Sequence, residues 1–550
     1  MHDPRDLFNQ VPPLADWNLY ASDPALQEAV MREGAGWAAA ALHAQGEALG
    51  RTDTLQLGEQ ANRHPPQHVS HDTRGRRIDR IDFHPAWNQL MSLLYADGVH
   101  CSAWMAPQHG AHVARAASFY LHGQVEAGSL CPVTMTFAAI PLLRREPALY
   151  GLLAERLAAR EYDPRELPLA QKRSATLGMG LTERQGGSDL RSNTARALPV
   201  AGGGRGGEYT LSGHKWFYSA PSCDAHLVLA RADEGLSCFF VPRWLDDGQL
   251  NAVHIGRLKD KLGNRSNASA EVEFHDALGI LVGEPGRGIP TLIEMAAHTR
   301  LDCVLGSAAL MRRALVEALH HARHRHAFGR ALEAQSLMRN VLADLALESE
   351  AAVVLAMHLA AAVDADRDNG ERLALARARR RILTPAAKFW VCKRAIAFTA
   401  ECMEVWGGNG YVEDGPMPRL LREAPVNSIW EGSGNVMCLD VLRAIAREPD
   451  SAALLLHDLA QGCAGEPLLT HALHALTTQL QSIGDMEWQA RNIASQLVLI
   501  TQACLLRRHA PAEVADTFIA SRFARPAGQV PGLLGDAAVA EKLLARSWRG

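Results

Sequence analysis

The sequence predicts a mainly α-helical protein with an inserted β domain, and three observations support this class. Apolar residues recur at helical spacing before about residue 170, β-type runs alternate with turn signals over residues 178–288, and helical spacing returns at Thr291. This order excludes the alternating β and α units of a dinucleotide-binding sheet. Because 550 residues exceed one small core, we expect four domains, with bounds 1–177, 178–288, 289–447 and 448–550.

The first predicted domain, residues 1–177, is a leader segment followed by helices. Leu26, Val30 and Trp37 fall at helical spacing, and Pro and Gly interrupt the pattern at intervals. We therefore expect helices throughout this region.

The second predicted domain, residues 178–288, should consist of short antiparallel strands. Turn signals, among them the glycine-rich run at 202–207, separate the β-type runs. The glycine-rich run lies between β-type segments and has no helix after it, so it is not a dinucleotide fingerprint. The β-type runs are residues 209–211, 225–230, 237–241 and 270–274.

The last two predicted domains are helical. In residues 289–447, long amphipathic segments with short connections indicate a helical bundle. Pro449 and Asp450 break the pattern and begin an additional helical domain, whose most regular segment is residues 493–506. The apolar positions that share one face of the first long helix are Leu301, Val304, Leu305, Ala308, Leu315 and Leu319.

Composition narrows the classes of partner and compartment. The chain is 47% hydrophobic and 21% charged, and its net charge of -4 gives no general attraction to nucleic acid or anionic membranes. None of the ten cysteines forms a C-x-x-C pair, so we expect buried free thiols and no metal site. The N-terminus lacks a secretory signal and no apolar run is long enough to span a bilayer, so we expect a soluble cytoplasmic protein with no membrane association.

Three segments carry residue types that could hold a planar cofactor. The first has hydroxyls around a Gly-Gly turn, the second is an aromatic triplet, and the third places a carboxylate beside Trp430 before a small-residue turn. Apolar surroundings would raise the pKa of Glu431 and suit it to act as a general base. The candidate residues are Leu181, Thr182, Gly187 and Ser188; Trp216, Phe217 and Tyr218; and Ile429, Trp430, Glu431, Gly432, Ser433, Gly434 and Asn435.

Each segment also has a plainer interpretation. The first could be an ordinary β-turn, and we expect one or two of the three aromatics to lie in a core instead. Glu431 could be an ordinary first-turn helix residue stabilised by the helix dipole.

Together the three segments resemble the acyl-CoA dehydrogenase family, over roughly residues 90 to 447. Arg325, Phe328 and Gln335 match the family's R-x-x-F-G-x-x-L-x-x-Q segment, and Gly407 and Gly408 match its G-G-x-G-Y turn. The resemblance implies a helical domain, a β domain and a helical bundle around FAD. It also implies oxidation of an acyl-CoA thioester with Glu431 as the base.

The same resemblance implies an oligomer. In the family, the arginine–glutamine segment and the double glycine reach the ADP part of FAD across a subunit interface. One departure concerns Glu404, which stands where the family usually has glutamine. A carboxylate there would repel the pyrophosphate unless it turns away or pairs, which puts the detailed ADP contacts in doubt.

The match is tighter to one branch of the family, the flavoproteins of the bacterial adaptive response to alkylating agents. The matching segments are residues 9–14 with 18–20, residues 260–267 and residues 425–435. The helical extension past Pro449 also fits. This resemblance implies a tetramer that binds double-stranded DNA through its C-terminal region. It further implies protection of DNA or deactivation of an alkylating small molecule, with weak activity toward isovaleryl-CoA.

Charge along the chain supports the DNA role in part. Residues 488–550 hold eight bases against four acids, and residues 372–400 hold eight bases and no acid. Most such runs are solvated helix faces, but a few of these bases could follow phosphates. We single out Arg443 and Arg522 as candidate DNA contacts. Two other functions stay open: a metabolic dehydrogenase of short or branched acyl-CoA, and a scaffold that binds FAD without turnover.

Overall fold

The computed structural model describes residues 8–365, 370–481, 486–524, 530–531, 534 and 537–548. Contacts divide the chain into two compact units. The β unit combines residues 53–107 and 125–302, and the helical unit combines residues up to Thr52 with residues 108–124 and those from Cys303 onward. The predicted first domain is thus shared between the two units.

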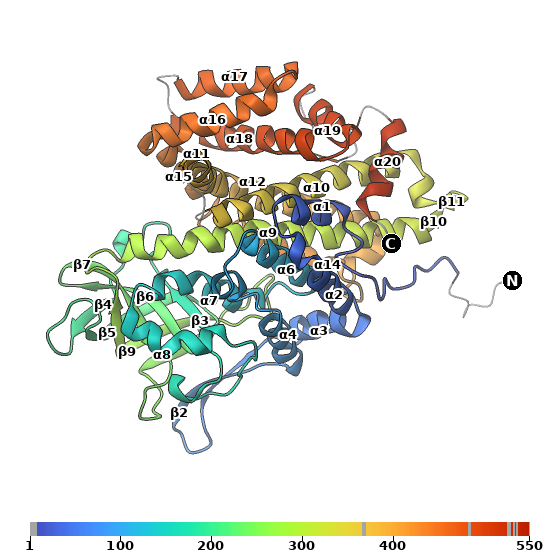
Figure 1. Ribbon diagram of the computed structural model, residues 1–550. Coiled ribbons are helices and arrows are strands. Elements are labelled where there is room, and N and C mark those ends of the chain that lie inside the picture. The colour runs from blue at the N-terminus through green and yellow to red at the C-terminus, as the bar shows by residue number, and fades with distance from the viewer. Residues whose placement is uncertain are drawn as a thin grey trace. The chain divides into compact units, whose positions relative to one another are not determined.

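The β unit contains the predicted β domain together with N-terminal helices (Figure 1). Its helices are α3 Thr52–Arg63, α4 Pro85–Ala96, α5 Ser102–Met105, α7 Leu130–Leu143 and α8 Pro147–Ala158. Its strands are β1 Gln67–His71, β2 Arg77–Asp82, β3 Leu177–Gly180, β4 Arg196–Pro199, β5 Glu208–Ser219, β6 Ala225–Ala232, β7 Gly235–Pro242, β8 Val253–Leu258 and β9 Ser269–Val282.

The main sheet closes on itself. Its strand order is β3-β6-β4-β5-β9-β7, β7 returns to β6, and β8 pairs with β9. All four predicted β-type runs lie inside strands, which confirms them. The expectation of short antiparallel strands is only partly correct, because β5 and β9 have 12 and 14 residues and β3 runs parallel to β6. The chain reaches β6 from β3 only after β4 and β5, a crossover long enough to permit parallel pairing.

The hairpin β1–β2 lies where only helices were expected. Its sequence is mostly polar, which hides the strand pattern, and Asp79 anchors it. The Asp79 carboxylate is buried and accepts hydrogen bonds from Arg77 Nε at 2.7 Å and from the backbone N–H of Ile255 at 3.1 Å. The hairpin is therefore fastened to β8 of the main sheet.

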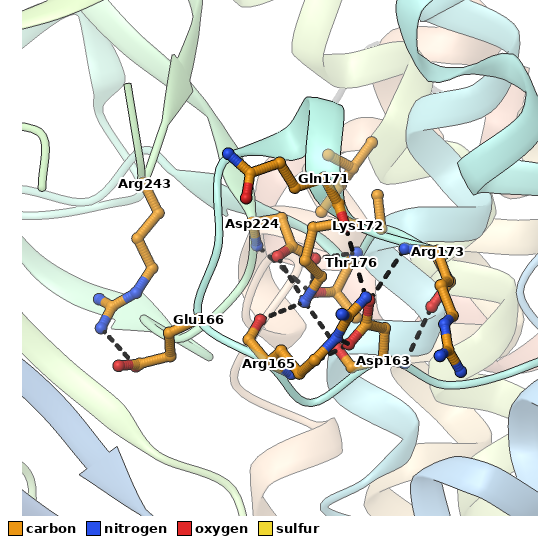
Figure 2. Close-up of polar contacts among 12 residues, drawn as sticks. Asp163, Arg165, Glu166, Gln171, Lys172, Arg173, Thr176, Asp224 and Arg243 are labelled. Atoms are coloured by element: carbon orange, nitrogen blue, oxygen red, sulfur yellow. Dashed lines mark hydrogen bonds and ion pairs between the residues drawn. The ribbon is translucent and has the colours of Figure 1, made fainter. Parts of the chain in front are cut away.

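The connection from α8 to β3 is held by a buried lysine (Figure 2). Lys172 lies 3.0 Å from the Asp224 carboxylate and donates to the backbone oxygens of Asp163 and Arg165 at 2.6 and 2.7 Å. The Asp224 carboxylate also accepts from the backbone N–H of Thr176 at 2.8 Å. These contacts fix the start of β3, which leads directly into the loop at Thr182.

The helical unit contains the long helices of the predicted bundle and the extension (Figure 1). Helix α9 begins in the β unit at Gly288 and ends here at His324. Helix α16 begins at Pro449, the residue at which the additional helical domain is expected to start. The elements are α1 Pro24–Arg32, α2 Ala39–Leu49, α6 Ala111–Val125, α9 Gly288–His324, β10 His326–Ala327, β11 Arg330–Ala331, α10 Ser336–Asp364, α11 Gly370–Ala378, α12 Thr384–Val405, α13 Gly408–Tyr411, α14 Met417–Asn427, α15 Gly434–Arg447, α16 Pro449–Cys463, α17 Pro467–Gln481, α18 Met486–His509, α19 Ala512–Ile519 and α20 Ala537–Ser547, with π-helical turns at Arg379–Leu383 and Ala520–Ala524.

The leader and the C-terminal helix meet at one buried arginine of α9. Arg312 donates to the backbone oxygen of Ser22 at 2.6 Å and to that of Ser547, and its Nε lies 3.3 Å from Asp23. Two backbone oxygens accept from this buried guanidinium, and the Asp23 carboxylate balances its charge. The leader around Ser22 and the end of α20 are therefore built into the helical unit.

The core of the helical unit includes α10. By length and composition α10 could cross a membrane, but 89% of its apolar window is buried inside the fold, as expected of a core helix. All ten cysteines are buried and free, which confirms the expectation of unpaired interior thiols. Among the residues the structure describes, no group of three or more His, Cys, Asp or Glu side chains is placed to hold a metal ion.

Candidate functional site

The loop at Thr182 and the aromatic strand β5 form one structure in the β unit. The backbone N–H of Trp216 donates to the Thr182 oxygen at 2.8 Å, and Asn193 Nδ2 donates to the Leu181 oxygen at 2.7 Å. Gly187 packs closely on Thr182, because an added Cβ would lie 2.4 Å from Thr182 Oγ1. Ser188 is exposed. The sequence-predicted loop and aromatic segment are thus adjacent within one unit.

A fully buried ion pair ties the two segments together. Glu183 Oε1 lies 2.8 Å from Lys215 Nζ, and both side chains are completely enclosed. The Glu183 carboxylate also accepts from the backbone N–H of Thr194 at 2.7 Å and of Ala195 at 3.1 Å. Sequence analysis missed this pair, which fixes the residues directly beside Thr182 and Trp216.

The electrostatics of the pair keep both groups charged at neutral pH. Although burial opposes ionisation, Lys215 and several hydrogen bonds lower the pKa of Glu183 to about 2. Burial lowers the pKa of Lys215 to about 8 against the attraction of Glu183. The pair is therefore ionic at pH 7.

The three aromatics of β5 have different environments. Trp216 is half-buried, with Lys259 Nζ 3.6 Å from its ring centroid, and Phe217 is 52% exposed. Tyr218 is buried, and its ring stacks on His226 with centroids 3.9 Å apart. Tyr218 is thus part of the sheet core and presents no exposed ring face to the predicted cofactor, because an irregularity in the pairing between Lys215 and Tyr218 interrupts the alternation of the strand. Trp216 and Phe217 reach the surface, where Lys259 lies over both rings.

The turn from Ile429 to Asn435 joins α14 to α15 in the helical unit. Ile429 is 64% exposed, and Trp430 Nε1 donates to Asn427 Oδ1 at 3.0 Å. Glu431 is half-buried and has φ +58°, a left-handed conformation that only a minority of non-glycine residues adopt. Because α15 begins at Gly434 with Ser433 as its N-cap, Glu431 precedes the helix, and the interpretation as a first-turn helix residue is wrong.

The segment matched to the ADP contacts is a small hairpin, β10–β11. Arg325 donates to the backbone oxygen of Asn9 in the leader. Gln335 accepts from Arg330 Nε at 2.9 Å and donates to the Ala327 oxygen at 2.9 Å. Both Arg325 and Gln335 therefore brace their own chain. Phe328, at the tip with φ +51°, is 97% exposed.

The double glycine follows a tryptophan that packs on the end of α9. Trp406 stacks on His321 with ring centroids 4.8 Å apart and donates to the Glu317 oxygen at 3.1 Å. Gly407 has φ +59° and ψ -140°, a conformation essentially limited to glycine. Gly408 begins α13, and Glu404, the departure from the family pattern, is exposed.

The two arginines predicted to contact DNA lie in different environments. Arg522 is 13% exposed, and its guanidinium binds the carboxylates of Asp344 at 2.6 Å and Glu348 at 3.2 Å. The prediction that Arg522 contacts DNA is therefore corrected to a structural ion pair within the helical unit. Arg443 is exposed on α15.

Many of the basic side chains in the two predicted basic segments also form ion pairs within the fold. In residues 372–400, Arg379, Arg381 and Arg394 pair with Asp458, Asp440 and Glu348 from distant segments, and Lys388 is buried. In the extension, Arg508, Lys542 and Arg546 pair with Asp458, Glu513 and Glu28, whereas Arg525 and Arg549 lie outside the described residues. Counting charge along the sequence overestimated the basic surface.

These residues fit a flavin by their chemistry. Phe217 in the β unit and Ile429 in the helical unit each expose apolar surface, which suits contact with a planar ring. The Ser433 side chain makes no capping hydrogen bond, which leaves N–H groups of the first turn of α15 for an electronegative group of the cofactor. The hydroxyls of Thr182 and Ser188 add further hydrogen-bonding groups.

Three family models match the chain in order. They are the adaptive response protein AidB N-terminal domain over residues 9–164, the acyl-CoA dehydrogenase middle domain over residues 178–277 and the acyl-CoA dehydrogenase C-terminal domain over residues 286–446. Among curated proteins, the putative acyl-CoA dehydrogenase AidB of Escherichia coli (strain K12) is 50% identical over 514 residues, which is 93% of each chain.

Two solved structures share the fold over most of the length. The Bd2924 apo-form has a TM-score of 0.83 and 30% identity, covering 91% of this chain and all of its own. Caenorhabditis elegans ACDH-11, solved in complex with C11-CoA, has a TM-score of 0.86 at 24% identity and covers 99% of this chain and 97% of its own. The fold, the matched domains and the identity to AidB together establish that the chain belongs to the acyl-CoA dehydrogenase family, in its AidB branch, and is an FAD-dependent flavoprotein.

Proposed function

We propose that this chain is an AidB-type flavoprotein of the adaptive response to alkylating agents, which binds double-stranded DNA and protects it or deactivates the reagent. The observation that carries the proposal is the 50% identity to AidB over 93% of both chains, with the AidB N-terminal model matching from residue 9 in the leader. The contacts of Arg312 with Ser22 and Ser547 support it, because they make these two regions part of one unit.

In the proposed site, the bound FAD supplies a two-electron acceptor. Thr182 and Ser188 would orient it through hydroxyl hydrogen bonds, and Trp216 and Phe217 would cover the ring and exclude water. Glu431 would remove the proton α to a thioester carbonyl, held in position by its turn. The helix start at Gly434 would stabilise negative charge nearby.

Flavin binding and flavin reduction are tested by purifying the protein and adding an acyl-CoA. We expect a yellow protein with FAD bound, and slow bleaching when isovaleryl-CoA is added without oxygen. Glu431→Gln should keep FAD but slow bleaching by about 100-fold or more. The matched control is Glu371→Gln, an exposed acid on α11, which should behave as the unchanged protein. Equal rates in the unchanged protein and Glu431→Gln would remove Glu431 from the proposal.

The DNA part is tested by a salt series. Arg443 is exposed on α15, and Arg443→Gln should weaken binding to duplexes of any sequence and lower the slope of log affinity against log salt by about 1. Arg508→Gln, whose arginine pairs with Asp458, is the control and should leave the slope unchanged. An affinity for DNA that does not fall with salt would reject the phosphate-contact model.

The proposal includes a homotetramer in the cytoplasm. The support from this chain is the exposure of large apolar groups at Phe328 and Tyr411, both in segments matched to the family's cross-subunit contacts. Light scattering coupled to size-exclusion chromatography should give four chains per particle. A monomer that retains FAD would contradict the shared site.

The second candidate is a metabolic dehydrogenase of short or branched acyl-CoA. The position of Glu431, in a turn ahead of α15 rather than within the helix, favours it because such a placement suits a working base. Rapid, complete bleaching by one acyl-CoA, with no affinity for DNA, would select this candidate over the first.

A further inference from the structure

The turn that carries Glu431 needs support, because its backbone is unfavourable. Glu431 has φ +58° and Gly432 has φ +108°. A non-glycine residue in the left-handed region is strained and is kept only where neighbouring contacts fix it. Identifying those contacts therefore identifies what sets the direction of the carboxylate.

One support comes from inside the helical unit. Lys388 of α12 is fully buried, and its ammonium donates to the backbone oxygen of Gly432, the residue after Glu431. Gly434 packs so closely on α12 that an added Cβ would lie 2.9 Å from Lys393 Cε and 3.2 Å from Phe389. Helix α12 therefore holds the middle of the turn.

A second support comes from the additional helical domain. Arg491 of α18 donates from Nε to Asn435 Oδ1 at 2.8 Å, and its guanidinium carbon lies 5.8 Å from the Phe389 ring centroid. Asn435 follows Gly434 at the start of α15. The extension therefore contacts the flavin-side turn directly, at a residue that belongs to the candidate site.

From this arrangement we infer that Arg491 is a positioning residue for the flavin site: the C-terminal extension completes the frame that fixes the turn of Glu431 and Asn435. Arg491 acts through Asn435 and needs no contact with the cofactor. The inference rests on the proposed function only in placing FAD against this turn. It gives the extension a role in flavin binding that does not depend on DNA.

The test is an FAD-binding measurement on the full-length apoprotein, without thioester or DNA. We expect Arg491→Gln to weaken FAD binding by about tenfold, which corresponds to about 1.4 kcal/mol, as for loss of a hydrogen bond to a charged group. The matched control is Arg507→Gln on the same helix, whose arginine donates to the Gly462 oxygen at 2.7 Å, away from the turn. It should bind FAD as the unchanged protein does.

A double-mutant cycle separates positioning from a general loss of stability. Once Asn435→Ala is present, adding Arg491→Gln should weaken FAD binding no further. Additive losses, equal losses in Arg491→Gln and Arg507→Gln, or unchanged binding in Arg491→Gln would each overturn the inference. If the unchanged protein fails to bind FAD, the placement of the flavin is wrong. If it binds FAD but Arg491→Gln has no effect, only this inference fails.

Discussion

Replacing Lys215 by methionine should damage the β unit more than any single surface change. The substitution leaves the Glu183 carboxylate fully buried without its cation. Removing one partner of a buried ion pair typically costs about 3–5 kcal/mol. In a unit of this size, each kcal/mol lowers the melting temperature by about 2–4 °C, so the expected decrease is on the order of 10 °C. FAD binding should weaken as well, because the pair holds Thr182 beside Trp216.

The assay is thermal unfolding of the apoprotein with an FAD titration. In the unchanged protein the pKa of Glu183 is about 2, below its ordinary value of 4.5, so its contribution is present above pH 4.5 and is lost as the pH falls toward 2. The difference in melting temperature between Lys215→Met and the unchanged protein should therefore become smaller below pH 4.5. Adding Glu183→Gln should recover much of the loss at neutral pH. A melting temperature within about 3 °C of the unchanged protein, or a double variant as unstable as Lys215→Met, would refute this reasoning.

Three further predictions follow from the contacts. Arg522→Gln should lower the melting temperature, because the buried carboxylates of Asp344 and Glu348 each lose one ion-pair partner, although Glu348 keeps Arg394. It should leave DNA affinity unchanged at fixed salt; lost affinity at an unchanged melting temperature would restore Arg522 as a DNA contact. Burial lowers the pKa of His226 to about 3, so the protein should lose stability as the pH falls from 6.5 toward 3. In His226→Phe the melting temperature should therefore change less between pH 7 and 5 than in the unchanged protein. An equally steep change would count against the burial argument. Lys388→Met should weaken FAD binding through the turn at Gly432, and unchanged FAD affinity would show that the turn holds without it.

The strands that the sequence predicted are runs of β-type residues separated by turn signals. The runs within β5, β6, β7 and β9 met this condition, so the β domain was predictable. The hairpin β1–β2 is mostly polar, and it is held by the buried Asp79 and its contact with Ile255. Such long-range contacts leave no local pattern in the sequence.

The sequence predicted the motifs of the candidate site but not the distant residues that hold those motifs in place. Thr182, Trp216 and Glu431 belong to recognisable segments, whereas Lys388 and Arg491 are separated from the turn they hold by many residues. A signal was present for the Glu183–Lys215 pair, because Glu183 directly follows Thr182 and Lys215 directly precedes Trp216, and a buried charge needs an opposite partner.

The runs of basic residues also gave a wrong expectation, because long-range contacts neutralise several of their side chains. Residues 372–400 contain no acid, yet Arg379 and Arg381 are neutralised by Asp458 and Asp440 across the helical unit. The net charge of a sequence window predicts the charge of the protein surface only when the charged side chains of that window reach solvent. Exposure, as at Arg443, is the property that a sequence count cannot supply.

The most direct measurement is a crystal structure of the protein with FAD bound. The account predicts one isoalloxazine per site in contact with Thr182 and Trp216 on one side and with the turn at Ile429–Glu431 on the other. Electron density for the ring away from either of these segments would contradict it.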